Sequence, residues 1–248
     1  MSTIAAPTSS LSYTSQVFAP VDRDHQVERV GGGFETEVYR TDDHRYVIKL
    51  KTHGDHNLQT ALTRTHSMRS IAEAFAHCLG PKHSIVSDYV LSEDDSGEVH
   101  ALVVQPFIQH ATPLDQVNYA ALSVEARDRV AKQLHEIIRR SLAFYRETGY
   151  MPDLYGLSSS SREDRARQST LRMLPWHLWT FFARRNILRS CNLLLTAAPE
   201  HRVILVDYDL VPWPHLLRRV YFAVRALMCW RDHLLVTRMH RHGRTGGQ

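Results

Sequence analysis

A glycine-rich stretch followed by a charged strand, Val27–Lys51, constrains this chain more than any other feature. Three consecutive glycines stand at its centre: Gly31, Gly32 and Gly33. Because glycine has no Cβ atom, its backbone N–H groups can approach phosphate oxygens closely. After a turn at residues 41–44, residues 46–50 are mostly β-branched or aromatic, which is typical of a strand, and Lys49 places one charge within it. The stretch predicts a β-hairpin and a strand whose lysine can reach a phosphate group.

The same residues resemble a known family. The glycines, Val38 and the run Val47-Ile48-Lys49 are similar to the amino-terminal lobe of the protein-kinase-like superfamily. Residues 32–40 have the form Gly-Gly-Phe-x-x-x-Val-Tyr-Arg, which is closer to the aminoglycoside-phosphotransferase-like, small-molecule branch. The resemblance implies an α+β, two-lobed fold with an antiparallel sheet in the amino lobe and, in this chain, a reduced helical carboxyl lobe. It also implies that ATP binds under the hairpin, with Lys49 holding its phosphates.

A helix and two strands are predicted to complete the amino lobe. Apolar spacing predicts a helix over residues 56–79, which Gly80 ends. In the superfamily such a helix supplies a glutamate that pairs with the strand lysine, and Glu73 is the only acidic residue on this one. A solvated surface glutamate is the alternative interpretation of Glu73.

The two strands that follow cover residues 85–91 and 100–108, and the second is almost continuously apolar, which indicates burial on both faces. The second strand ends where the resemblance places the hinge between the lobes. There, backbone groups of Gln105 and Phe107 are expected to contact adenine, because the intervening Pro106 has no N–H to donate.

The catalytic residues are predicted from the second half of the chain. A helix over about 123–148 ends at Gly149 and is followed by Asp153-Leu154. In the family this aspartate accepts the proton of the attacking hydroxyl, so the resemblance makes Asp153 the base. Asn192 precedes one short apolar strand and Asp207 ends another. The resemblance implies that these two residues hold Mg²⁺, a cation that prefers oxygen ligands.

Two alignments of this middle region compete. In the first, Asp153 is the base and residues 157–190 are an insertion between the base and the metal ligands. In the second, the family's five-residue spacing to Asn192 is kept strictly, so Ile187 occupies the aspartate position and the loop is catalytically dead. We prefer the first, because it keeps the Asp-Leu pair directly after the long helix.

The remaining organisation follows from composition. Residues 1–25 are rich in small and polar residues and are predicted to be a flexible leader, and residues 26–108 form the predicted amino lobe. The carboxyl lobe is expected over residues 109–240, where a long amphipathic helix ends, followed by a basic tail at 241–248. The arginines of that helix argue against a membrane span, and docking on the lobe is preferred to contact of its basic face with a membrane.

Composition also excludes several classes of protein. The formal net charge of +4 is mild for 248 residues, so no nucleic-acid partner is expected. The sixteen histidines are scattered without metal-type spacing, and no zinc site is predicted. Three cysteines, odd in number and far apart, favour a reduced, cytoplasmic setting.

The predicted function is therefore ATP- and Mg²⁺-dependent phosphoryl transfer to a hydroxyl of an acceptor that the sequence does not name. The alternative is a catalytically inactive, kinase-like protein that acts as a nucleotide-binding or scaffold module. The strict alignment and the short carboxyl lobe favour that alternative.

Overall fold

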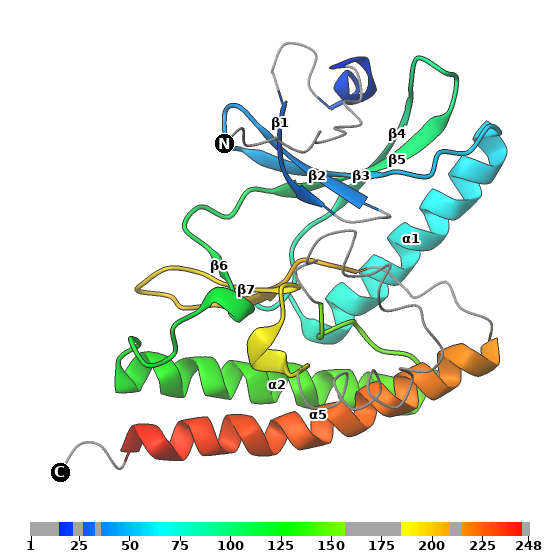
Figure 1. The fold of residues 1–248 in the computed structure, drawn as a ribbon. Coiled ribbons are helices and arrows are strands. Elements are labelled where there is room, and N and C mark those ends of the chain that lie inside the picture. The colour runs from blue at the N-terminus through cyan, green and yellow to red at the C-terminus, as the bar shows by residue number, and fades with distance from the viewer. Residues whose placement is uncertain (1–14, 22–26, 33–35, 157–184, 209–214, 245–248) are drawn as a thin grey trace, which may run out of the picture. The chain divides into compact units, whose positions relative to one another are not determined.

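The structure is a computed structural model that describes residues 15–21, 27–32, 36–156, 185–208 and 215–244 (Figure 1). Parts of the predicted leader, insertion and tail lie outside these residues, and so does Gly33. Contacts within the chain divide it into two units, which are described one at a time. Unit 1 comprises Met1–Thr65 and Asp88–Val104, and unit 2 comprises His66–Ser87 and Gln105–Gln248.

Unit 1 contains a five-stranded sheet. Its strands are β1 (Val27–Gly32), β2 (Thr36–Thr41), β3 (Tyr46–Lys51), β4 (Asp88–Glu93) and β5 (Val99–Pro106). They lie in the order β1-β2-β3-β5-β4, and the pairs β1–β2, β2–β3 and β4–β5 are antiparallel. The predicted hairpin and lysine strand are therefore present, and every residue of β5 except Pro106 is buried, as its apolar sequence predicts.

One face of this sheet forms a compact core. Ile48 and Leu50 on β3 pack with residues of the short 3-10 helix η1 (Ser15–Phe18), and the Phe18 and Tyr39 ring centroids lie 4.7 Å apart. Val17 and Phe18 are almost fully buried. This part of the predicted leader is thus packed into the core rather than flexible, because its two apolar side chains cover the sheet.

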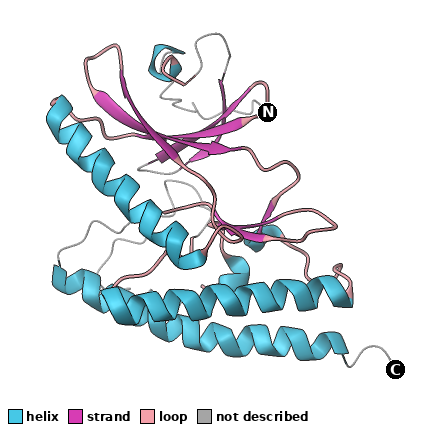
Figure 2. Ribbon diagram, turned by 180° about the vertical axis from the view of Figure 1, so that it is seen from behind, coloured by secondary structure: helices cyan, strands magenta, loops and turns pink. Residues whose placement is uncertain are grey.

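Unit 2 is built mainly from helices. The helices α2 (Val124–Thr148) and α5 (His215–Arg244) lie side by side in both views (Figures 1 and 2). Ser123 caps the start of α2 by accepting a hydrogen bond from the N–H of Ala126, and Gly149 ends the helix with a left-handed φ of 78°. The glycine therefore ends this helix as the sequence predicts.

A small three-stranded sheet completes unit 2. Its strands β6 (Thr112–Pro113), β7 (Leu193–Leu195) and β8 (Val203–Leu205) pair antiparallel in that order. Two 3-10 turns, η2 (Leu114–Gln116) and η4 (Ile187–Arg189), flank it. The helix α1 (Leu58–Leu79) runs from unit 1 into unit 2 and ends before Gly80, whose φ is 76°.

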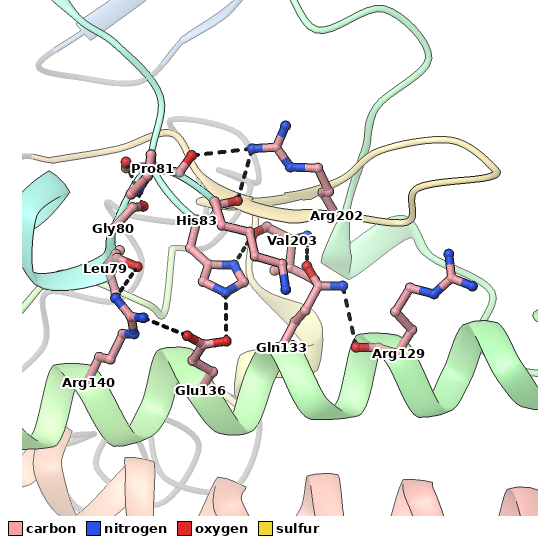
Figure 3. Close-up of polar contacts among 12 residues, drawn as sticks. Leu79, Gly80, Pro81, His83, Arg129, Gln133, Glu136, Arg140, Arg202 and Val203 are labelled. Atoms are coloured by element: carbon pink, nitrogen blue, oxygen red, sulfur yellow. Dashed lines mark hydrogen bonds and ion pairs between the residues drawn. The ribbon is translucent and has the colours of Figure 1, made fainter.

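Polar side chains of α2 fix the position of β8 (Figure 3). The Gln133 side chain accepts a hydrogen bond from the N–H of Val203 at 3.0 Å. The buried His83 donates from Nδ1 to the Val203 carbonyl at 2.9 Å, and its Nε2 lies 3.4 Å from Glu136. Since Glu136 also pairs with Arg140 at 2.7 Å, the strand that leads to Asp207 is held by a connected polar network.

The predicted α+β class, with an antiparallel sheet in the amino-terminal part and helices after it, is confirmed. One strand is displaced: β4 begins at Asp88, whereas the sequence predicts a start at residue 85. Ile85 lies outside the strand because its N–H bonds to the Tyr208 hydroxyl at 2.6 Å. In the described ranges, none of the helices combines the length and the apolar character needed to cross a bilayer.

Candidate functional site

The glycine hairpin has the backbone geometry that only glycine tolerates. Gly32 adopts a φ of 135°, and a Cβ atom added there would lie 2.8 Å from the Cα of Glu37 and from the carbonyl oxygen of Thr36. The register between β1 and β2 also shifts between Arg29 and Gly31. The hairpin is therefore a bulged turn whose backbone a side chain at position 32 would distort.

Lys49 lies in register with this hairpin. Gly31 pairs with Val38 across β1 and β2, and Val38 pairs with Lys49 across β2 and β3. The neighbours of Lys49 on β3, Ile48 and Leu50, are buried in the core, so Lys49 projects from the opposite face and is half-buried. Gly31 and Lys49 thus belong to one cross-strand row. They lie two strand spacings, or roughly 10 Å, apart.

Glu73 lies on the part of α1 that belongs to unit 2. Its carboxylate forms an ion pair with Arg69 at 2.9 Å, and both side chains are about two-thirds exposed. An exposed i,i+4 pair of this kind contributes little to stability. Because Lys49 belongs to the other unit, the predicted pairing of Lys49 with Glu73 stays a prediction.

Gln105 and Phe107 flank the end of β5. The Gln105 side chain is buried and donates hydrogen bonds to the Ser87 hydroxyl at 2.9 Å and to the Val206 carbonyl at 3.0 Å. Phe107 is half-buried. The Gln105 side chain thus has a structural partner directly before Asp207, while contact of the backbone with adenine stays a prediction.

Asp153 and Asn192 are brought together by two loops that pack against each other. We call residues 153–156 the Asp153 loop and residues 190–192 the Asn192 loop. Asn192 donates from Nδ2 to the Asp153 carbonyl at 3.0 Å, and the Cys191 N–H donates to the Gly156 carbonyl at 3.1 Å. A Cβ atom on Gly156 would lie 1.9 Å from Asn192 Oδ1. The close approach of the two loops therefore requires glycine at position 156.

Asp207 joins the same region through strand pairing. Leu193 pairs with Leu205, and the next residues continue the ladder, since the Val206 N–H donates to the Asn192 carbonyl at 3.0 Å. Asp207 therefore follows directly on the residue opposite Asn192. The predicted base and the two predicted metal ligands come from three segments of the chain and meet at the ends of β7 and β8.

The pKa of Cys191 is shifted by the carboxylates that lie near the ends of β7 and β8. Burial, together with the negative charges of Asp115, Asp207 and Asp153, raises the pKa of the Cys191 thiol to about 11. Asp115, which sequence reasoning missed, is thus a third carboxylate near the predicted ligands. Its Oδ1 is buried and accepts no hydrogen bond from the described part of the chain.

A buried arginine holds Asp153. Arg225 on α5 is only 3% exposed and lies 3.3 Å from Asp153 Oδ1. Its guanidinium lies over the rings of Tyr155 and Tyr221, at 4.9 and 4.8 Å from their centroids, and donates to the Tyr221 hydroxyl at 2.6 Å. The N–H of Tyr155 also donates to Asp153 Oδ1, at 2.9 Å. The carboxylate is therefore fixed through one of its two oxygens.

Other pKa shifts agree with this arrangement. Burial raises the pKa of the Tyr221 hydroxyl, and the nearby charge of Asp153 adds to the effect. Burial lowers the pKa of Arg185, and the positive charge of Arg225 lowers it further. Sequence reasoning used Arg225 only as one of the charges that argue against a membrane span. The sequence nevertheless contains a signal that Arg225 is buried, because it lies on the same helix face as Tyr221 and Met228, at i, i+4, i+7 spacing.

Ile187, the residue that the strict alignment places at the base position, is fully buried in η4. Its N–H donates to Asp232 Oδ2 on α5 at 2.7 Å, and Arg231 donates to the carbonyl of Arg185. Burial raises the pKa of Asp232, while the hydrogen bond from Ile187 and the charge of Arg231 oppose that effect. The loop is thus anchored to α5 but offers no ionisable side chain at position 187, whereas the Asp153 side chain is 25% exposed.

Comparison with solved structures finds two phosphotransferases and a MAP kinase at low sequence identity. The chain is similar to a mutant aminoglycoside 2′-phosphotransferase in its GDP complex, with 15% identity and a TM-score of 0.46 over 94% of this chain and 82% of that one. It is similar to a spectinomycin phosphotransferase in complex with ADP and spectinomycin, with 15% identity and a TM-score of 0.37 over 75% of this chain. A MAP kinase from Leishmania major gives 11% identity and a TM-score of 0.39 over 79% of this chain.

The chain spans 63% of the spectinomycin enzyme and 49% of the MAP kinase. No family model and no curated protein sequence matches the chain.

Proposed function

We propose that this protein binds ATP with Mg²⁺ and transfers a phosphoryl group to a hydroxyl of an acceptor molecule. The observation that carries the proposal is the meeting of Asp153, Asn192 and Asp207 at the ends of β7 and β8. Phosphoryl transfer needs little covalent chemistry from the protein. It needs a positioned nucleophile and neutralised phosphate charge, which a base beside metal ligands can supply.

Asp153 is the residue proposed to accept the proton of the acceptor hydroxyl. Its Oδ1 is held by the Tyr155 N–H and by Arg225, which leaves Oδ2 as the oxygen that a hydroxyl would approach. The arginine is itself fixed between two tyrosine rings. A carboxylate with a fixed rotamer orients the attacking oxygen, which is the main contribution of the base in such reactions.

The residues present fit Mg²⁺. Asn192 and Asp207 offer an amide and a carboxylate oxygen, and Asp115 Oδ1 is a further buried oxygen nearby without a hydrogen bond in the described residues. Hard oxygen donors of this kind are the ligands that Mg²⁺ prefers. When bound, the ion neutralises charge on the transferred phosphoryl group. Asn192 and Asp207 would hold it, and the bond from Nδ2 to the Asp153 carbonyl fixes the direction of the Asn192 oxygen.

The glycine hairpin and Lys49 are proposed to hold the phosphates of the nucleotide. Backbone N–H groups of a bulged glycine turn can approach phosphate oxygens, and Lys49 lies in the same cross-strand row as Gly31. Glu73 is proposed to orient Lys49, and the backbone at Gln105 and Phe107 to receive adenine.

An inactive, nucleotide-binding protein is the second candidate, and one observation favours it. The loop from Ile187 to Asn192 is anchored to α5 through Asp232, yet the residue at the strict base position is a buried isoleucine. In this candidate the protein binds nucleotide through the same hairpin and lysine but does not turn it over.

Thermal unfolding in the presence of Mg·ATP tests nucleotide binding. A ligand that binds only the native state and is present at a concentration of about 100 times its Kd stabilises the protein by about 2.7 kcal/mol. The melting temperature should therefore rise. Lys49→Ala should remove most of this shift, whereas Lys82→Ala, at an exposed lysine outside the proposed site, should retain it. Absence of both a shift and binding heat at millimolar Mg·ATP in the folded protein would contradict both candidates.

Turnover separates the two candidates. Asp153→Asn should slow ATP turnover by about 10²–10⁴-fold with nearly unchanged ATP affinity, because the base acts on chemistry rather than on binding. Asp207→Asn should instead weaken the Mg²⁺-dependent part of binding. Asp88→Asn, at the exposed start of β4, is the control. Turnover that survives Asp153→Asn and is lost with Asp207→Asn would remove Asp153 from the role of base while leaving nucleotide chemistry intact.

A further inference from the structure

Three potential metal ligands gather at the hairpin between β4 and β5 in unit 1, apart from the residues assigned above. His100 Nε2 lies 3.2 Å from Asp94 Oδ2 and 3.9 Å from Glu98 Oε2. The three ligand atoms all lie within 4.8 Å of one another. Atoms bound to one ion at about 2.0–2.2 Å lie roughly 3–4 Å apart, so the cluster is close to the size that an ion would impose.

His100 is the buried member of this cluster, with a side chain that is 1% exposed. Its Nδ1 lies 2.9 Å from the carbonyl oxygen of Lys51. Because a carbonyl can only accept, Nδ1 carries the proton, and Nε2 is the nitrogen that faces the carboxylates. A histidine that donates one ring N–H to a backbone carbonyl and presents the other nitrogen to acidic groups has the orientation found in metal-binding histidines.

Asp94 is fixed in a matching orientation. Its Oδ1 accepts hydrogen bonds from the Ser96 N–H, the Ser96 hydroxyl and the Glu98 N–H, at 2.9, 2.7 and 2.9 Å. These donors hold the turn and occupy one oxygen of the carboxylate. The other oxygen, Oδ2, is therefore directed toward His100, and neither group has to rearrange to bind an ion between them.

Gly54 provides the space for this arrangement. A Cβ atom on Gly54 would lie 2.8 Å from Glu98 Oε2 and 2.9 Å from His100 Cε1. Its φ is not in the left-handed region, so backbone conformation does not explain the glycine. The reason is steric: the segment after β3 passes directly over the side chains of Glu98 and His100.

A second imidazole stands at the exposed edge of the cluster. His56 Nε2 lies 3.5 Å from Glu98 Oε1, and its side chain is 83% exposed. Because it is exposed, His56 can change rotamer without disturbing the core. The cluster therefore has a movable nitrogen donor within reach of one fixed nitrogen and two carboxylates.

We propose that Asp94, Glu98 and His100 bind one divalent transition-metal ion of the Zn²⁺ class, with His56 as a fourth ligand. Imidazole and carboxylate together suit Zn²⁺ and related ions, whereas Mg²⁺ and Ca²⁺ prefer oxygen donors alone. The ion would join the segment after β3 to the β4–β5 hairpin, so its role is structural. Sequence spacing did not reveal the site, because the ligands come from both sides of a turn and from a segment about forty residues earlier.

Metal titration of the full chain tests this inference. After treatment with a chelator, isothermal titration with Zn²⁺ should show one tight equivalent that is distinct from weak binding to other surface histidines. Glu98→Gln and His56→Ala should each weaken this equivalent by at least ~10-fold. Both side chains are partly or largely exposed, so these variants should fold. Asp95→Asn, at an exposed residue of the same turn, is the matched control and should leave the equivalent unchanged.

Cobalt gives an independent readout. Co²⁺ bound to two imidazoles and two carboxylates should produce visible absorption that Glu98→Gln abolishes and Asp95→Asn preserves. The inference is overturned if the folded protein shows no tight equivalent with Zn²⁺ or Co²⁺, because the contacts of His100 with Asp94 and Glu98 then account for the cluster. It is also overturned if the tight equivalent survives in both Glu98→Gln and His56→Ala. Neither outcome depends on nucleotide binding.

Discussion

The glycine hairpin and the packed Asp153 and Asn192 loops are assembled in different ways. In the hairpin, neighbouring strands pair in sequence order, and the residues of the Gly31–Val38–Lys49 row lie within about twenty positions of one another. Between the loops, Asn192 bonds to the Asp153 carbonyl across 39 positions, and beside them the Gln105 side chain bonds to the Val206 carbonyl across 101. The first region depends on local backbone geometry, whereas the second depends on side chains that meet only in the folded state.

This difference identifies where each region is vulnerable. A hairpin built from backbone pairing tolerates most side-chain changes and fails where the backbone itself is unusual. Loops that are joined by side-chain contacts fail when one contact is removed, because the partner that remains is buried and polar. The following predictions separate these two kinds of dependence.

Removal of the buried guanidinium should have the largest effect on stability. Arg225→Met removes the cation beside Asp153 and the contacts with Tyr155 and Tyr221. Breaking a buried ion pair costs about 3–5 kcal/mol, and the 25% exposure of Asp153 places the expected loss near 3 kcal/mol. Urea unfolding measures the loss. The exposed ion pair of Arg69 with Glu73 provides the control, because Arg69→Met should lower the free energy of unfolding by less than about 0.5 kcal/mol.

A double-mutant cycle sharpens this prediction. If the cost of Arg225→Met arises from the unpaired Asp153, it should fall when Asp153→Asn is already present. An equal cost in both backgrounds would assign the stabilisation to the tyrosine contacts alone.

Replacement of Gly156 tests the contact between the two loops. The new Cβ atom would lie 1.9 Å from Asn192 Oδ1, so the amide has to move and its bond to the Asp153 carbonyl is lost. Gly156→Ala should destabilise the protein by about 1–3 kcal/mol and weaken Mg²⁺-dependent nucleotide binding. Nucleotide titration with and without Mg²⁺ checks the second effect. Unchanged stability together with unchanged binding would show that the loops do not need this close approach.

A Gly→Ala substitution in the hairpin should lower stability only where the backbone conformation is unusual. Gly32→Ala forces a side chain into a φ of 135° and against the backbone of Thr36 and Glu37, which should cost about 1–2 kcal/mol. Gly31→Ala is the matched control, because a Cβ atom there meets no described residue within 4 Å and should change stability by less than about 0.5 kcal/mol. Thermal unfolding of the two variants side by side measures the difference, and equal losses would contradict the backbone explanation.

The smallest effect should be a pH dependence from the network on α2. Burial alone would raise the pKa of Glu136, but the hydrogen bond from His83 and the charges of His83 and Arg140 outweigh it, so the pKa lies below its usual value of 4.5. A carboxyl with a lowered pKa stabilises the fold above that usual value, and the contribution disappears as the pH falls through the lowered pKa. Glu136→Gln should therefore lose less stability than the parent on acidification. Glu147→Gln, on the exposed face of the same helix, is the control.

The sequence predicted the hairpin, the lysine strand and most helix ends because each has a local cause. Glycine ends α1 and α2 where a left-handed residue is needed, and alternation along β3 separates Ile48 and Leu50 from Lys49. Asp153, Asn192 and Asp207 were predicted through a family resemblance, and their roles stay predictions. The ion pair of Asp153 with Arg225 and the gathering of Asp94, Glu98 and His100 were not foreseen. The ion pair joins residues far apart in the sequence, and the gathering of the three ligands depends on how the β4–β5 turn folds, so no periodicity in the sequence encodes either.

The strand β8 has a further consequence for how the chain folds. It contains three residues. The carbonyls of Val203 and Val206 accept hydrogen bonds from the side chains of His83 and Gln105, and the N–H groups of the same two residues donate to the Gln133 side chain and the Asn192 carbonyl. A strand this short has little stability of its own, so its order depends on these four partners. During synthesis on the ribosome these segments emerge over more than a hundred residues, and loops of that length are slow to close. The residues around Asp207 should therefore be among the last to become ordered, and amide exchange after refolding should show their protection appearing late and together.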